Sequence, residues 1–155
     1  MAEVYRSDVI AAPVERVWAV VRDFNALPVW TPFVADSRIE GGGPSDRIGC
    51  VRAFRLRDGG TIRERLLGLD DRDHSCRYAI LEADMAVENY VAKLRLMRVS
   101  DGNRTFAEWA ADFDCSRADE PGLVRLIGDE VFASGLAALR RRFAPAPGVS
   151  GRFAA

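Results

Sequence analysis

The sequence predicts a single α+β domain in which helices near the two ends of the chain cover one face of an antiparallel sheet. Three observations support this prediction. The length of 155 residues suits one domain. Segments typical of strands dominate between residues 36 and 116, and short turns join them as antiparallel hairpins. Amphipathic helical segments lie on both sides of this region, and their apolar faces must be buried against the sheet.

The first predicted strand spans residues 3–11, and a helix is expected to follow it. Pro13 suits the first turn of a helix, where its missing N–H would have no partner in any case. The apolar residues that follow have the i, i+3, i+4, i+7 spacing of an amphipathic helix: Val14, Val17, Trp18 and Val21. Residues 25–33 contain two prolines, so only a short helical turn or a loop carrying Trp30 is expected there.

Six further strands are predicted before the last helix. The first begins at residue 36 and ends at the Gly-rich stretch 41–44, and the others are expected at residues 48–57, 61–70, 75–82, 88–100 and 103–115. The sequence 58–60 (Asp-Gly-Gly) marks one hairpin turn. The pair Asp101-Gly102 marks another and is typical of a type I′ turn.

A long helix of about six turns is predicted at residues 121–143. Its apolar surface is expected to consist of Leu123, Leu126, Ile127, Val131, Leu136, Leu139 and Phe143. The residues after it, 144–155, are rich in Pro, Gly and Ala and predict a flexible tail. The folded domain is therefore expected to cover residues 1–143.

The alternation of apolar and charged residues predicts how the last two strands pair. A two-residue turn at Asp101-Gly102 would place Leu94 opposite Trp109 and Ala92 opposite Ala111. These four apolar side chains then lie on one face, so the turn and the alternation agree on which face is inward.

Two ionisable residues interrupt the inward face of the middle strands. A three-residue loop at 58–60 would pair Arg52 with Leu66 and Phe54 with Glu64, which makes Arg52 and Glu64 diagonal neighbours. A hairpin at residues 71–73 would place Tyr78 beside Leu66.

An inward Arg–Glu pair is costly, because desolvating each ion takes several kcal/mol. Two interpretations remain open: an ordinary ion pair at a rim or sheet edge, or a polar anchor in an apolar pocket. Such an anchor would orient a carbonyl, carboxylate or hydroxyl group. General acid or base catalysis by Glu64 would also require a raised carboxylate pKa.

Composition argues against several classes of function. The net charge of −1 makes neither nucleic acid nor an anionic membrane an expected partner. Cys50, Cys76 and Cys115 fall in predicted strands without metal-ligand spacing, so buried free thiols are expected, with no disulfide and no zinc site. His74, the single histidine, lies in a predicted turn, and no nucleophile–His–acid set or nucleotide-binding motif is present. No metal and no cofactor are therefore expected.

The sequence also bears on location. The N-terminus lacks a basic segment followed by an apolar run, and no apolar stretch approaches the ~18 residues that span a bilayer. A cytoplasmic location is the expectation. The oligomeric state is left open.

Short motifs follow one another along residues 3–143. They are ApVERVWavVrDFnaLpvW at residues 12–30, G-x-x-R at 49–52, DGGtIrERLL at 58–67, RYAI at 77–80, NY at 89–90 and EWaadF at 108–113. In order and spacing the chain resembles the START/Bet v1-like (SRPBCC) superfamily, especially its bacterial polyketide cyclase/dehydrase and lipid-transport branch.

The resemblance implies a helix-grip fold, in which a curved sheet of about seven strands wraps around the long C-terminal helix. Two short helices follow the first strand, and a cavity lies between sheet and helix. In such proteins the ligand-binding positions are inward strand residues, the loop of the short helices and the long helix. Matched to this sequence, they are Trp30, Phe33, Arg52, Phe54, Glu64, Tyr78, Tyr90, Trp109, Phe113, Ile127 and Val131.

The resemblance implies that the chain binds a small hydrophobic or amphipathic ligand, such as a lipid or polyketide. One alternative is a cyclase or aromatase-type enzyme that uses Arg52 and Glu64. A second alternative is a partner-assisting or maturation protein. No catalytic residue is carried over, because cyclases of this kind depend on pocket shape and a few polar groups. Trp30, in its Pro-bracketed loop, is expected to close the mouth of the pocket.

Overall fold

The protein is described by a computed structural model that covers residues 1–145, so the predicted tail lies outside the described residues from residue 146 onward. The strands are β1 (Ala2–Ile10), β2 (Val34–Ile39), β3 (Val51–Leu56), β4 (Thr61–Asp70), β5 (Ser75–Glu82), β6 (Glu88–Val99) and β7 (Arg104–Asp114). The helices are α1 (Val14–Val21), α2 (Leu27–Trp30), the 3₁₀ turn η1 (Glu40–Gly42), α3 (Glu120–Arg125), the π-helix η2 (Leu126–Ala133) and α4 (Ser134–Arg142). The predicted α+β class and order of elements are confirmed.

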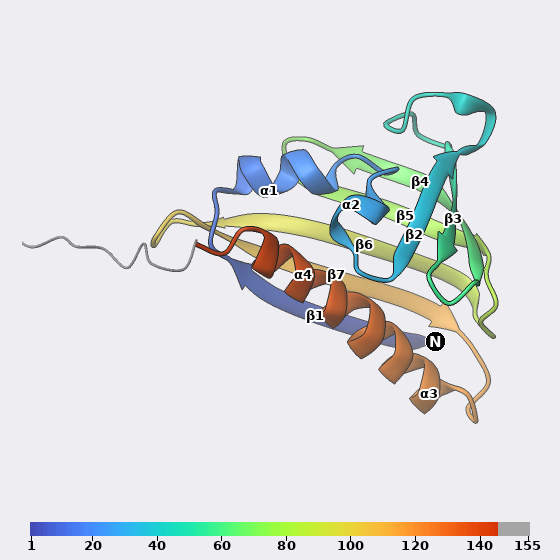
Figure 1. The fold of residues 1–155 in the computed structure, drawn as a ribbon. Coiled ribbons are helices and arrows are strands. Elements are labelled where there is room, and N and C mark those ends of the chain that lie inside the picture. The colour runs from blue at the N-terminus through green and yellow to red at the C-terminus, as the bar shows by residue number, and fades with distance from the viewer. Residues whose placement is uncertain (146–155) are drawn as a thin grey trace, which may run out of the picture.

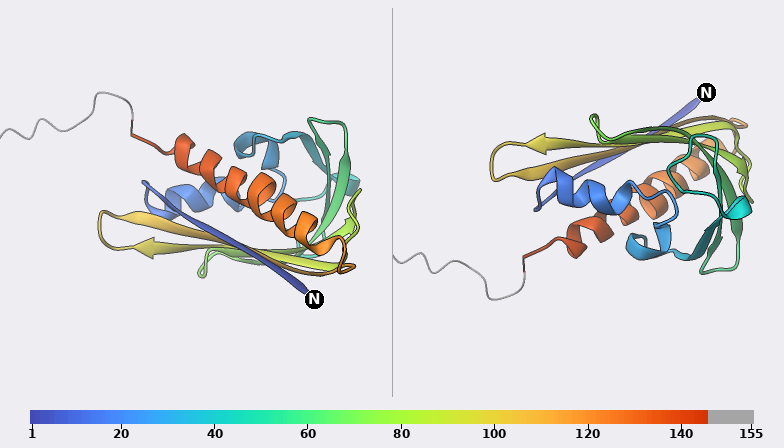
Figure 2. Two further views of the ribbon diagram at one scale, coloured as in Figure 1. Left: turned by 90° about the horizontal axis from the view of Figure 1, so that it is seen from below. Right: turned by 90° about the horizontal axis from the view of Figure 1, so that it is seen from above.

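The seven strands form one sheet in the order β1-β7-β6-β5-β4-β3-β2, and every pair in it is antiparallel. The sheet curves around the C-terminal helix, which is formed by α3, η2 and α4 (Figure 1). Seen from two further directions, α1 and α2 lie on this same concave side (Figure 2). One face of the sheet is thus covered by helices, as the hydrophobic patterning requires.

The predicted pairing of β6 with β7 is confirmed, since Leu94 lies opposite Trp109 and Ala92 opposite Ala111. The predicted type I′ turn is wrong. That turn needs positive φ at both Asp101 and Gly102, whereas the positive values occur at Gly102 and Asn103. Asparagine tolerates the left-handed conformation, and a four-residue loop, 100–103, joins the last strand pair Val99–Arg104 without changing the register.

The predicted pairing of β3 with β4 is wrong by two residues. The three-residue loop is Arg57–Gly59 instead of 58–60, and the Leu56 N–H closes it by donating to the Gly60 carbonyl at 2.7 Å. Arg52 consequently lies directly opposite Glu64. A shift of two residues keeps every side chain on its predicted face, because the side-chain period of a strand is two. Tyr78 lies opposite Leu66, as predicted.

The C-terminal helix contains a π-helical segment that its sequence pattern did not predict. Phe132, absent from the predicted apolar face, has no exposed surface, whereas Val131 is only partly buried. A π turn holds more residues than the 3.6 of an α-helix, so positions within it rotate relative to the α-helical pattern.

Gly135 marks a close approach of the helix to the indoles of the core. A Cβ atom there would lie 2.9 Å from the Trp109 ring and 3.4 Å from that of Trp30. Both indoles are buried in the core and have little room to move. The sheet and helix are therefore in direct contact at this level.

Gly135→Ala is expected to lower the free energy of unfolding by about 1–3 kcal/mol, because the added methyl group overpacks the two indoles. Gly122→Ala is the matched control, since a Cβ there meets no atom within 4 Å. The free energy of unfolding of this control is expected to rise by up to about 1 kcal/mol, because alanine has a higher helix propensity than glycine. Chemical denaturation compares the two variants, and equal stabilities would contradict the close contact at Gly135.

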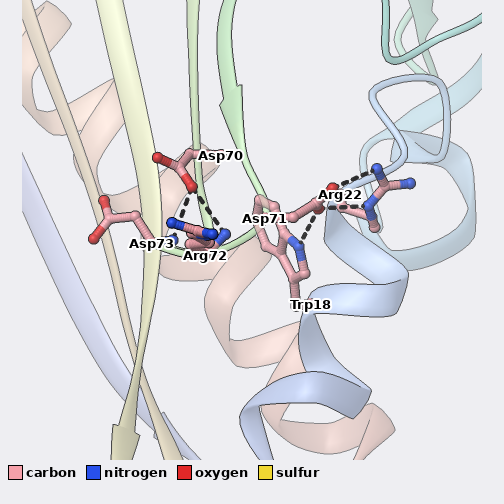
Figure 3. Close-up of polar contacts among 6 residues, drawn as sticks. All are labelled: Trp18, Arg22, Asp70, Asp71, Arg72 and Asp73. Carbon is pink, nitrogen blue, oxygen red and sulfur yellow. Dashed lines mark hydrogen bonds and ion pairs between the residues drawn. The ribbon is translucent and has the colours of Figure 1, made fainter.

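A polar cluster attaches α1 to the turn between β4 and β5 (Figure 3). The Trp18 indole N–H donates to Asp71 at 2.7 Å, and Arg22 donates to both oxygens of the same carboxylate at 2.9 and 3.1 Å. These contacts hold the pKa of Asp71 below its usual value. His74 lies in this turn, as predicted, and its ring meets the Trp18 indole edge-on at 5.7 Å.

The cysteines only partly match expectation. Cys76 is buried in β5, but Cys50 and Cys115 are half-buried and lie one residue outside β3 and β7. All three are free thiols. No helix in residues 1–145 is long and apolar enough to cross a membrane.

Candidate ligand-binding cavity

A cavity of about 460 Å³ lies between the middle strands of the sheet, α2 and the π-helical segment. Most side chains around it are aliphatic or aromatic. The lining residues are Leu27, Phe33, Arg52, Phe54, Leu56, Asp58, Gly60, Thr61, Ile62, Glu64, Tyr78, Ile80, Asp84, Met85, Tyr90, Trp109, Leu126, Ile127 and Val131. Three of them, Asp58, Thr61 and Asp84, are also exposed to solvent. The mouth is therefore at the β3–β4 and β5–β6 turns.

The inner end of the cavity is polar because Arg52 and Glu64 face each other there. Each residue is only 5% exposed. The Arg52 Nε and Nη2 atoms lie 2.7 and 2.6 Å from Glu64 Oε2. An ion pair at a rim or sheet edge, one of the two interpretations open from the sequence, is thus excluded.

The remaining contacts of Arg52 are also made within the protein. Its Nη1 donates to the Phe24 carbonyl at 2.7 Å. The guanidinium lies 3.8 Å from the centre of the Phe24 ring and 4.9 Å from that of Tyr78. Contacts of this kind between a cation and aromatic faces partly replace lost hydration. Two nitrogen atoms of Arg52, Nε and Nη1, donate hydrogen bonds within the protein, and its charge is balanced by Glu64.

Glu64 retains one carboxylate oxygen for other partners. Both contacts from Arg52 reach Oε2, and Oε1 forms no hydrogen bond within residues 1–145. In that part of the chain no fully buried polar side-chain atom lacks a partner, so Oε1 must be accessible from the cavity that Glu64 lines. Burial raises the pKa of Glu64, while the positive charge of Arg52 opposes the shift.

Two tyrosines lie beside this carboxylate. Tyr78 accepts a hydrogen bond of 2.9 Å from the Trp109 indole N–H. Burial raises the pKa of both Tyr78 and Tyr90, and the negative charge of Glu64 adds to the shift. Both phenols are therefore uncharged near neutral pH, and the inner end of the cavity offers one ion pair and two hydroxyl groups.

Nine of the eleven residues predicted to bind ligand line this cavity, and two lie elsewhere. Trp30 is not at the mouth; it is 6% exposed and its ring is 5.7 Å from Trp109 in the core. Phe113 is 1% exposed and stacks behind Tyr90 at 5.9 Å. Contact of the other nine with a ligand stays a prediction.

Sequence reasoning missed ten lining residues: Leu27, Leu56, Asp58, Gly60, Thr61, Ile62, Ile80, Asp84, Met85 and Leu126. The inward alternation of the strands could have identified Leu56, Ile62 and Ile80, which share the face of Glu64. The mouth residues Asp58 and Asp84 lie in turns, whose side-chain direction alternation does not specify. Residues 1–145 contain no group of three or more His, Cys, Asp or Glu side chains suited to hold a metal ion.

A cavity enclosed between a concave antiparallel sheet and a long C-terminal helix defines the helix-grip, START/Bet v1-like class of proteins. Within that class, residues 1–144 match the family described as "Polyketide cyclase / dehydrase and lipid transport". The chain belongs to this family.

Individual relatives agree with this assignment. The chain is 34% identical over 84 residues to the abscisic acid receptor PYL7 of Arabidopsis thaliana, a match that covers 52% of this chain but only 38% of the receptor. Among solved structures, it is similar to XoxI of Bacillus cereus, with a TM-score of 0.82, 30% identity and coverage of 92% of this chain and 96% of that one. It is also similar to a protein of Thermobifida fusca, with a TM-score of 0.83, 33% identity and coverage of 92% of this chain and 93% of that one.

Proposed function

We propose that the protein binds one small hydrophobic or amphipathic molecule, such as a lipid or polyketide, in the cavity between sheet and helix. The observation that carries the proposal is the space of about 460 Å³ with a mainly apolar wall. Protein interiors are otherwise close-packed, and small-molecule sites have volumes of ~300–1,000 Å³ with a few polar groups. The family description includes lipid transport, and PYL7 is named as a receptor for abscisic acid.

Filling the cavity is expected to weaken binding. Val131→Trp introduces a large side chain on the helical wall, and we expect it to weaken binding of the uncharged fluorescent probe phenylnaphthylamine at least about tenfold. Val29→Trp is the matched control, because Val29 is 58% exposed and lies outside the cavity. Fluorescence titration measures both affinities. Equal affinities for the two variants would place the probe elsewhere and contradict the proposal.

A cyclase or aromatase-type enzyme is the second candidate function, and the carboxylate of Glu64 favours it. A carboxylate whose pKa is raised by burial is a stronger base, and its free oxygen is accessible from the cavity. Such an enzyme would use Glu64 to remove a proton from a bound polyketide, with Arg52 holding the carboxylate in place. The test compares turnover and binding of a polyketide substrate by the parent protein and by Glu64→Gln. Catalysis is established if the parent turns the substrate over and the variant binds it without turnover.

A further inference from the structure

The residues that line the cavity include more negative than positive side chains. Its lining contains one cation, Arg52, and three carboxylates, those of Asp58, Glu64 and Asp84. The charge of Arg52 is paired with that of Glu64, and its Nε and Nη1 atoms donate to Glu64 and to the Phe24 carbonyl. The lining therefore carries two carboxylates in excess, and an acidic ligand would find no unpaired cation there.

The free carboxylate acceptor is Glu64 Oε1, which lies at the inner end of a mainly apolar space beside the hydroxyl groups of Tyr78 and Tyr90. An ionised carboxylate oxygen forms its strongest hydrogen bonds with donors, and such charge-assisted bonds are about twice as strong as neutral ones. A ligand carboxylate brought to the same place would repel it at low dielectric, and the carboxylates of Asp58 and Asp84 at the mouth would add to the repulsion.

We infer that the bound molecule carries a hydrogen-bond-donating polar group, a hydroxyl or a protonated amine, which binds Glu64 Oε1, and that carboxylate-bearing ligands are rejected. The inference rests on the proposed function and specifies the chemical class of its ligand. The apolar body of the molecule then lies along the aliphatic wall of Ile62, Ile80 and Val131.

A set of ligands with equal chains and different head groups tests this assignment. Dodecanol, dodecylamine, dodecane and dodecanoate each compete with bound phenylnaphthylamine, and the loss of fluorescence gives their affinities. Dodecanol or dodecylamine is expected to bind at least about tenfold more tightly than dodecanoate, which corresponds to one charge-assisted hydrogen bond. Dodecanoate binding as tightly as both donors would overturn the inference while leaving the proposed function intact. Absence of binding by the probe and every chain would overturn both.

Two variants identify the acceptor. In Arg52→Met/Glu64→Leu the ion pair is replaced by apolar side chains of similar volume, a change that buried pairs often tolerate. The parent protein is expected to bind dodecanol more tightly than dodecane, because the hydroxyl group donates to Glu64 Oε1. This variant is expected to keep the probe and lose that preference. Asp58→Asn/Asp84→Asn is the control, and its preference for dodecanol is expected to remain. If only the control variant Asp58→Asn/Asp84→Asn lost the preference for dodecanol, the polar group of the ligand would bind at the mouth. That result would overturn the role of Glu64.

Discussion

Arg52→Ala is expected to lower the free energy of unfolding by about 3–5 kcal/mol, the typical effect of removing one partner of a buried ion pair. The substitution leaves Glu64, which is 5% exposed, without a compensating charge. It also removes the donor to the Phe24 carbonyl and the cation that lies against the Phe24 ring. Urea unfolding at neutral pH measures the loss.

The pH dependence of this loss distinguishes an uncompensated charge from lost packing. Burial already raises the pKa of Glu64 above its ordinary value of 4.5, and removal of Arg52 takes away the contact that opposes the shift. A raised pKa in the folded state destabilises the ionised form, so the loss is largest at neutral pH and shrinks as pH falls toward 4.5.

The double variant Arg52→Met/Glu64→Leu provides the matched control for this prediction. Because it leaves neither charge behind, its stability is expected to lie within about 2 kcal/mol of the parent or above it, with little dependence on pH between 5 and 7. A loss of less than about 1 kcal/mol for Arg52→Ala alone would show that solvent in the cavity screens the Glu64 carboxylate.

Trp109→Ala is expected to cost about 3–5 kcal/mol, as large aromatic truncations in a core do. Trp109 is 2% exposed, stacks on Phe132 at 4.5 Å between ring centres and contacts Trp30. Its loss removes these contacts and leaves the Tyr78 hydroxyl without its donor. Chemical denaturation provides the measurement.

Trp109→Phe separates the two contributions of the indole. Phenylalanine retains most of the stacking on Phe132 but cannot donate to Tyr78, so a smaller loss of about 1–2 kcal/mol is expected. A loss below about 1 kcal/mol for Trp109→Ala would mean that the indole contributes little to the contact between the sheet and the helix.

Local signals in the sequence were sufficient to predict the hairpin-linked antiparallel strands and the helices that cover them, but not the pairing of β1 with β7. Turn sequences separate the strands, and the alternation around Trp109 and Leu94 identifies the inward face. An error of two residues at the β3–β4 turn did not change which face Arg52 and Glu64 occupy, because strand faces depend only on parity. For this reason an inward Arg–Glu pair was predicted even though its register was wrong.

Features that depend on three-dimensional packing could not be predicted in the same way. The π-helical segment replaces the 3.6-residue period, so Phe132 was missed although it is fully buried. Trp30 contacts Trp109 in the core because Gly135 lets the helix come close to both indoles. The mouth residues Asp58 and Asp84 lie in turns, where no periodic pattern predicts the direction in which a side chain points.

The central claim is that the cavity admits an apolar guest, and methyl NMR during titration with phenylnaphthylamine tests it most directly. The methyl signals of Ile62, Ile80, Ile127 and Val131, which line the cavity, are expected to shift together and to saturate at one probe per chain. The exposed methyl groups of Val9 and Val29 are expected to stay unchanged. Shifts confined to those surface methyl groups, or no shifts at all, would contradict the claim.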